Sequence, residues 1–261
     1  MTNPANHHQA ELADFYDRAA ELCRRDDEKR IRAPQHLRRC ANLAQLCTGF
    51  SHPVRVLDLG CGTGRYFHCL NNTEMIVGAD RSGEMLWHAK SPVKTNDRAW
   101  ANIVLIQNDL YEMAFAAGSF DVIYSFGVFG HGAVLTPELC QRLYTWLAPG
   151  GRLYLDAIAQ GGAGRGRQWT RTFLRVFFPI SRRRTVQRHF DAIPVVVHSR
   201  EQIGRLLGDA GFADLTIDEH DCRELFFQGS ILECSAMKRT DAEGTRVVLS
   251  PWLSWPQKIR M

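Results

Sequence analysis

The sequence has no run of about 18 apolar residues, the length that a helix needs to cross a bilayer. Its first residues, MTNPANHHQAELADF, also lack the basic stretch and apolar core of an export signal. The composition is otherwise that of a soluble globular protein, with 45% apolar and 23% charged residues. These absences predict a cytoplasmic protein.

The chain has eight cysteines, but none of them forms the C-x-x-C pair that is typical of zinc sites and redox motifs. Several cysteines lie inside apolar segments, where buried thiols are common. We therefore expect reduced core thiols of a cytosolic protein, with no disulfide framework and no metal site.

Acidic residues are absent between Ala157 and Phe190, and eight arginines occur there. The whole chain has a net charge of +4, from 32 Lys and Arg and 28 Asp and Glu. Without those eight arginines, 24 basic residues would face 28 acidic ones, so the rest of the chain nets −4. The basic character of the chain is therefore confined to one segment. The arginines of this segment are Arg165, Arg167, Arg171, Arg175, Arg182, Arg183, Arg184 and Arg188.

A length of 261 residues suits one α/β domain, or one domain with a small appendage. Apolar segments and helix signals alternate five times and are followed by two successive strands, which predicts parallel strands, helices on both faces and an antiparallel addition. The expected strands are 54–59, 75–80, 103–107, 120–128, one after a turn at 149–151, 214–219 and 231–237. The expected helices are 8–47 with a break near Pro34, 64–71, 82–90, 136–147 and 199–210.

Three glycines follow the first strand in VLDLGCGTGRYF, residues 56–67. Gly60 and Gly62 allow a tight turn and a close approach of the backbone to a ligand. The spacing is G-x-G-x-G, whereas the dinucleotide fingerprint is G-x-G-x-x-G, and Arg65 stands where its third glycine would be. The loop indicates a bound nucleoside, although a pyrophosphate or a turn without a ligand also fits.

An acidic residue lies at or just after the end of each of the next two strands. Asp80 lies 20 residues after Gly60, where a carboxylate accepts hydrogen bonds from ribose hydroxyls. Asp109 ends the third strand, where it can accept from an adenine amino group while Leu110 packs on the ring. A helix cap at Asp80 and a turn at Asp109 are the simpler alternatives. Dehydrogenases and methyltransferases share the ribose acid, so these residues alone do not name the nucleoside.

Taken together, VLDLGCGTG, GADRSGEML, NDL before FDVIYSFGV, and LAPGGRLYLD resemble the class I, seven-stranded, Rossmann-like S-adenosylmethionine-dependent methyltransferases. The resemblance covers about residues 50–160, and SREQIGRLLGDAGF is similar to the last helix of that family. It implies a doubly wound α/β fold, with a mostly parallel seven-stranded sheet and one antiparallel strand. A helical cap (1–48) would precede the methyltransferase domain (49–238), which would carry a helical lid insertion (about 160–195) and be followed by a tail (239–261).

The resemblance also implies roles for individual residues. Asp58 and the glycine loop would border the methionine part of S-adenosylmethionine, Asp80 would hold the ribose, and Ser125 and Phe126 would contact the sulfonium. The expected cofactor-binding residues are Tyr16, Asp58, Gly60, Cys61, Gly62, Gly64, Asp80, Arg81, Asp109, Leu110, Ser125 and Phe126.

Two further residues are assigned by their position in the chain. His131 follows the fourth strand, where this family faces its acceptor, and is a candidate general base. A polar wall residue is the alternative, because methyl transfer does not always need a base. Tyr16, in the first helix, would fold over the cofactor, with simple helix packing as the alternative.

The arginine segment contains Trp169, Phe173, Val176 and Phe177 at the spacing of one helix face. A lid that packs on the domain and pairs its arginines with the acidic remainder is one interpretation. An amphipathic helix on an anionic membrane is another, and nucleic-acid binding is a third. An acceptor with its own phosphate or carboxylate fits all three.

We therefore expect a methyltransferase that acts at O or N of a small-molecule or lipid-like acceptor. The alternatives are a tRNA-modifying methyltransferase, an NAD-dependent oxidoreductase and a nucleoside-binding module without catalysis.

Replacing Arg182, Arg183 and Arg184 together by Gln is expected to weaken association with anionic vesicles, because each arginine near such a surface contributes about 1 kcal/mol. Vesicle co-sedimentation measures this. If the wild-type protein ignores anionic vesicles at low salt, the membrane interpretation is wrong.

Overall fold

A computed structural model describes residues 4–93, 102–161, 195–223 and 227–240 of the chain. The predicted lid, the arginine segment 165–188 and the predicted tail lie almost entirely outside these residues, so they stay predictions, as do the domain boundaries. Within the described residues, no helix is both long enough and apolar enough to cross a membrane.

The centre of the fold is a seven-stranded sheet with the order β3-β2-β1-β4-β5-β7-β6. All pairs are parallel except those of β7, which is antiparallel to both β5 and β6. The strands are β1 Val54–Leu59, β2 Thr73–Asp80, β3 Ile103–Gln107, β4 Phe120–Phe129, β5 Leu147–Ile158, β6 Phe212–Arg223 and β7 Gln228–Lys238. The prediction of a mostly parallel sheet with one antiparallel strand is confirmed.

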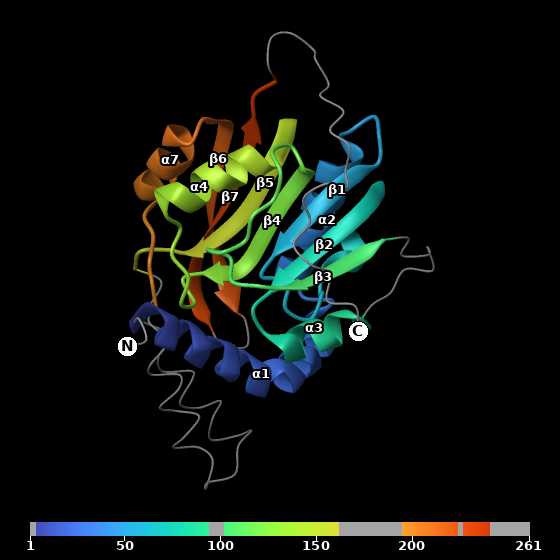
Figure 1. Cartoon of the computed structure of the whole chain (residues 1–261), viewed down its shortest axis with the longest axis vertical. Coiled ribbons are helices and arrows are strands. Elements are labelled where there is room, and N and C mark those ends of the chain that lie inside the picture. The colour runs from blue at the N-terminus through green and yellow to red at the C-terminus, as the bar shows by residue number, and fades with distance from the viewer. Residues whose placement is uncertain (1–3, 94–101, 162–194, 224–226, 241–261) are drawn as a thin grey trace, which may run out of the picture.

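Helices cover both faces of the sheet. The described helices are α1 Pro4–Arg30, α2 Pro34–Thr48, α3 Gly83–Ala89, α4 Pro137–Trp146 and α7 Arg200–Asp209. Apolar side chains of α4 and α7 pack into one core with alternate residues of β1 and β4, and those of α2 and α3 pack into a second core with the other residues. Figure 1 shows α4 and α7 together on one face, while α1 crosses one end of the sheet.

Three helices begin where the sequence predicts, each after a hydroxyl residue that caps its first turn. Ser82 accepts from the backbone N–H of Met85 at 3.0 Å, and Thr136 accepts from Leu139 at 3.2 Å. Ser199 accepts from the N–H of Gln202 at 3.1 Å. Each hydroxyl satisfies a donor that the first helical turn leaves unpaired.

The predicted helix at 64–71 is wrong. The structure has only a 3-10 turn, η1 Phe67–Cys69, because Gly64 takes φ +73°, outside the right-handed helical region. A Cβ at Gly64 would lie 2.8 Å from the Phe67 ring, so the turn packs directly on this glycine. The predicted turn at 149–151 appears as a bulge in β5, where Phe120 pairs with Leu147 but Val122 pairs with Arg152.

The sequence also predicted that the cysteines form no disulfide, and this prediction is wrong. Cys40 in α2 and Cys69 in η1 form a disulfide, although they lie 29 residues apart. The other six cysteines are free, and most of them are buried. Spacing gave no sign of the pair, because only the packing of α2 on the turn after the glycine loop brings these two residues together.

A buried cation connects α2 to the sheet. The Arg39 side chain is fully buried, and its Nε donates to Glu233 of β7 at 2.9 Å. Another nitrogen of the same guanidinium donates to Asp156 of β5. Burial alone would raise the pKa of Glu233, but Arg39 and hydrogen bonds from Arg38 and Tyr154 outweigh it and hold that pKa below its usual value.

Replacing Arg39 by Met is expected to lower the free energy of unfolding by about 3–5 kcal/mol, because Glu233 and Asp156 stay buried without their cation. Urea unfolding followed by circular dichroism measures this. Arg38→Met is the control, since Arg38 donates to the same Glu233 from a half-exposed position and should cost about 1 kcal/mol or less. Equal losses in the two variants would contradict the assignment.

Candidate functional site

A pocket lies at the carboxyl ends of β1, β2 and β4, and α1 lines one side of it. It encloses about 1240 Å³ of empty space, part of which is open to solvent. The strand order reverses between β1 and β4, the position at which open α/β sheets bind ligands.

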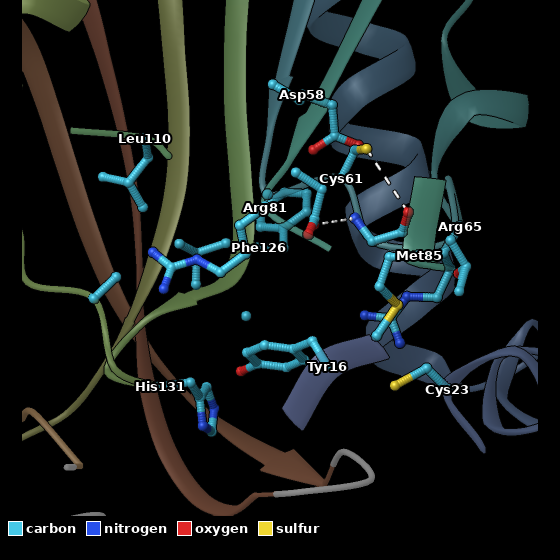
Figure 2. A pocket seen from close by; sticks show the side chains of 18 of the residues that line it. Tyr16, Cys23, Asp58, Cys61, Arg65, Arg81, Met85, Leu110, Phe126 and His131 are labelled. Carbon is cyan, nitrogen blue, oxygen red and sulfur yellow. Dashed lines mark hydrogen bonds between the residues drawn. The ribbon is translucent and has the colours of Figure 1, made fainter. Parts of the chain in front are cut away.

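The pocket brings together most of the predicted site residues, many of which are labelled in Figure 2. Those that line it are Tyr16, Asp58, Gly60, Cys61, Gly62, Asp80, Arg81, Leu110, Phe126 and His131. Gly64, Asp109 and Ser125 are not among the lining residues.

The glycine loop runs along the pocket wall with positive φ angles at Gly60 and Gly64. A Cβ at Gly60 would lie 2.2 Å from a methyl group of Val128, so only glycine fits where β1 leaves the sheet beside β4. The atoms nearest to a Cβ at Gly64 belong to the Phe67 ring. The third glycine therefore shapes the turn behind the loop, while Gly60 and Gly62 face the pocket.

Asp80 connects the end of β2 to this loop. Its Oδ2 accepts from the backbone N–H of Gly62 at 2.8 Å, and its Oδ1 accepts from that of Ser82 at 2.9 Å. Burial raises the pKa of Asp80, although these backbone hydrogen bonds counteract the shift. The carboxylate is thus held in a fixed orientation at the pocket wall, with lone pairs left for ligand hydroxyls.

Asp58 is a second buried acid in the pocket, one residue before the end of β1. Burial raises its pKa to about 8. Asp58 is therefore largely protonated at neutral pH in the structure as it stands. A cation placed beside it would draw off this proton.

The structure places the predicted adenine region differently from the sequence. Asp109 forms an ion pair with Arg81, with 3.0 Å between Oδ2 and the guanidinium, and its Oδ1 accepts from the N–H of Tyr111. Asn108, which sequence analysis missed, lines the pocket together with Leu110 and Met113. Asn108 directly follows β3, in the motif NDL, and this position is the signal by which the sequence could have identified it. An adenine contact of Asp109 stays a prediction.

Helix α1 makes polar contacts with residues beside the pocket at two places. Asp27 accepts a hydrogen bond from the Thr63 hydroxyl in the glycine loop and forms an ion pair with Arg65 at 3.4 Å. Asp17 accepts from the Ser82 hydroxyl at 2.5 Å. The sequence gave no sign of either contact, because each joins residues far apart in the chain.

Tyr16 directly precedes Asp17 in α1 and lines the pocket. Figure 2 shows its hydroxyl pointing toward the side on which His131 lies. Burial raises the pKa of Tyr16, so the phenol stays protonated and acts as a donor at neutral pH.

Another part of the pocket wall is formed by residues at the end of β4 and after it. His131 lines it, with its ring centroid 5.6 Å from that of Phe227. Phe126 also lines it, whereas the Ser125 hydroxyl is buried in the sheet and donates to the carbonyl of Leu59 at 2.7 Å. A sulfonium contact of Ser125 thus stays a prediction that its side chain does not support.

Comparisons with known proteins agree with this geometry. Residues 56–151 match the family model described as a methyltransferase domain. A curated relative, demethylmenaquinone methyltransferase of Lactococcus lactis, is 33% identical over 107 residues. The match spans 38% of this chain and 40% of the relative, so the chain covers well under half of that protein.

Solved structures share the fold at low sequence identity. Magnesium protoporphyrin IX methyltransferase from Synechocystis PCC 6803, with bound S-adenosylhomocysteine, is 17% identical with a TM-score of 0.60, covering 88% of this chain and 99% of that one. Phosphoethanolamine N-methyltransferase 2 from Haemonchus contortus, with phosphomonomethylethanolamine and S-adenosylhomocysteine, is 17% identical with a TM-score of 0.55, covering 78% and 53%.

The glycine loop and Asp80 lie inside the matched segment, and the sheet is the mostly parallel seven-stranded sheet that the resemblance predicts. The dinucleotide interpretation of the loop has no support from the matched family. The chain therefore contains a segment that matches a methyltransferase domain, and this segment and the fold together support its resemblance to the class I, Rossmann-like S-adenosylmethionine-dependent methyltransferases.

Proposed function

We propose that this chain is an enzyme that transfers the methyl group of S-adenosylmethionine to an oxygen or nitrogen of a small-molecule or lipid-like acceptor. The observation that supports it most is the pair of acids, buried Asp58 and half-buried Asp80, on the two sides of a glycine loop at the switch point of the sheet. The relatives named above are a demethylmenaquinone, a protoporphyrin and a phosphoethanolamine methyltransferase, all with small acceptors.

The pocket residues fit S-adenosylmethionine in three parts. Asp80, already oriented by two backbone N–H groups, would accept from the ribose hydroxyls. Asp58 would face the ammonium of the methionine part, a cation that favours its carboxylate form. Leu110 and Met113 offer an apolar wall for adenine, with Asn108 as its polar partner.

The cofactor supplies a methyl group that its sulfonium already activates, so the protein has to place the acceptor in line with it. Phe126, Phe227 and Tyr16 would exclude water around the acceptor. His131 is the proposed base for an acceptor that must lose a proton, because the Tyr16 phenol stays protonated. The thiol of Cys61 is kept protonated by burial and forms a wall without chemistry of its own.

Incubation with methyl-labelled S-adenosylmethionine and fractionated metabolites tests this proposal, with label transfer and S-adenosylhomocysteine as readouts. Calorimetry with S-adenosylhomocysteine and with NAD is the companion measurement. Tighter binding of NAD would contradict the proposal, and label transfer to RNA would move the acceptor to the tRNA alternative.

Replacing Asp80 by Ala is expected to weaken S-adenosylhomocysteine binding by about 10- to 100-fold, because hydrogen bonds to a charged acceptor contribute about 1.5–3 kcal/mol. Isothermal titration calorimetry measures this. Asp218→Asn, which removes an exposed acid of β6, is the control and should bind like the wild type. Unchanged affinity in the Asp80 variant would exclude the ribose assignment.

The affinity for S-adenosylhomocysteine is expected to rise with pH up to about 8, the pKa of Asp58 in the ligand-free protein. Below that pH the carboxyl is protonated and must release its proton when the ligand ammonium binds, at a cost of up to about 1.4 kcal/mol per pH unit. Calorimetry in buffers with different ionisation enthalpies counts the released proton.

Asp58→Asn is the matched variant, because its amide resembles the protonated acid. It should bind weakly and lose the proton release assigned to Asp58. An identical pH slope in this variant would assign the titration to Asp80, whose pKa is also raised by burial.

A further inference from the structure

Four potential metal ligands gather outside the pocket, between α2 and η1. They are His36 and Cys40, one helical turn apart on α2, and the neighbours His68 and Cys69 in η1. Their ligand atoms all lie within 4.8 Å of one another. His36, His68 and Cys69 are buried and Cys40 is half-buried, so the cluster is closed off from bulk water.

Three sulfur–nitrogen distances in this cluster are close to those of a tetrahedral site. Cys40 Sγ lies 3.4 Å from His36 Nε2 and 3.8 Å from His68 Nε2, and Cys69 Sγ lies 3.3 Å from His68 Nε2. Zinc bonds of about 2.3 Å to sulfur and about 2.1 Å to nitrogen at tetrahedral angles place sulfur and nitrogen about 3.6 Å apart. Both imidazoles thus present Nε2 to the sulfurs at a spacing that one metal ion could bridge.

The cluster differs from a metal site in one respect, the disulfide between Cys40 and Cys69. Opening it takes two electrons and two protons, which a dithiol reductant supplies as it becomes a disulfide itself. Each sulfur is then a thiol, and a divalent cation that binds both displaces their two protons. The same pair of cysteines can therefore exist as a disulfide or as metal ligands, but not as both.

We propose that His36, Cys40, His68 and Cys69 bind a single Zn²⁺ when the two cysteines are reduced, and that the disulfide is the metal-free form. Two thiolates and two imidazoles fill all four positions of a tetrahedral ion, as in structural zinc sites. The site has no open position for a substrate, so its role is structural. A reducing compartment keeps the cysteines as thiols and so favours the metal form.

A plain buried disulfide is the competing interpretation, and the two histidines count against it. A disulfide needs no imidazole partners, yet both His36 and His68 lie within hydrogen-bonding range of its sulfurs. The i, i+4 spacing on α2 places His36 and Cys40 on one helix face, and this face meets η1. Two of the four potential ligands come from a helix and two from a turn, so the packing of these two elements brings all four to one place.

The proposed site lies next to the cofactor pocket. The His36 ring stacks on Tyr66 with their centroids 5.0 Å apart, and Tyr66 lines the pocket. The turn η1 follows the glycine loop directly. Metal binding would therefore hold α2 against the turn that carries the glycine loop, and its loss is expected to lower the thermal midpoint of the whole domain.

The test uses the full chain without an affinity tag, since a histidine tag would bind metal itself. The protein is reduced with a dithiol, its free thiols are titrated, and it is then incubated with Zn²⁺ and freed of excess metal. We expect a single Zn²⁺ per chain, measured by a chromophoric chelator or elemental analysis. Co²⁺ in place of Zn²⁺ should give the strong visible bands of a tetrahedral site and a thiolate charge-transfer band.

The Cys40→Ser/Cys69→Ser variant should lose Zn²⁺ affinity by more than about 100-fold, beyond the effect of an outer-shell partner. Cys47→Ala is the matched control, because Cys47 is a buried free cysteine of the same helix. It should retain the metal and the Co²⁺ spectrum. His36→Gln should retain both thiols but lose the tetrahedral spectrum.

Wild-type protein in its oxidised and reduced forms provides a comparison that needs no variant. The proposal is overturned if reduced protein with all thiols titratable binds no more Zn²⁺ than the double serine variant. It is equally overturned if the oxidised protein binds as much metal as the reduced one. None of these readouts involves methyl transfer, so they stand or fail independently of the proposed function.

Discussion

The buried guanidinium of Arg39 is the interaction on which the arrangement of this domain depends. It joins α2 to β5 through Asp156 and to β7 through Glu233, and it lies over the Phe126 ring at 4.5 Å. Asp156 in turn accepts from the N–H of Gly127, which lines the pocket. One fully buried cation therefore contacts residues that hold the end of β4, where Phe126 and Gly127 line the pocket. Breaking such a network costs more than its net contribution to stability, because the acids stay buried.

The pocket is closed by polar contacts of α1 instead of by apolar packing alone. Asp27 binds the glycine loop, and Asp17 binds the cap of α3, so the helix rests on both sides of the site. With Asp58 and Asp80 inside, the pocket is rich in acids, balanced by Arg65 and Arg81 at its wall. This distribution of charge suits a cationic cofactor, whose sulfonium and ammonium would be met by carboxylates.

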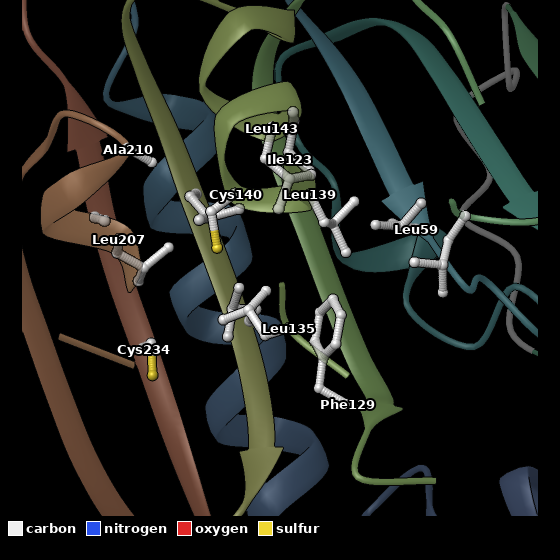
Figure 3. Packing of buried hydrophobic residues seen from close by; sticks show 14 of the residues in the cluster. Leu59, Ile123, Phe129, Leu135, Leu139, Cys140, Leu143, Leu207, Ala210 and Cys234 are labelled. Carbon is white, nitrogen blue, oxygen red and sulfur yellow. The ribbon is translucent and has the colours of Figure 1, made fainter. Parts of the chain in front are cut away.

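Local signals in the sequence predicted most of the fold. Short apolar segments predicted the strands, and helices pack on them, with Leu139 and Leu143 of α4 near Ile123 of β4 in Figure 3. Caps at Ser82, Thr136 and Ser199 defined helix starts because each acts within three residues. The contacts that could not be predicted join residues far apart in the chain, such as the Asp27–Thr63 hydrogen bond and the Cys40–Cys69 disulfide. It also expected a helix after Gly64, where a positive φ allows only a short turn.

The place of β7 has a consequence for how the chain reaches its native state during synthesis. This strand comes last in the chain among the strands but lies between β5 and β6, and its Glu233 is 194 residues from Arg39. Loop closure over such a separation is slow, and it requires the C-terminal strand to have left the ribosome. Until then the Arg39–Asp156 ion pair lacks its contact with Glu233, and β5 lacks its pairing with β7. Translation must therefore run almost to the end of the described chain before the cofactor pocket becomes rigid.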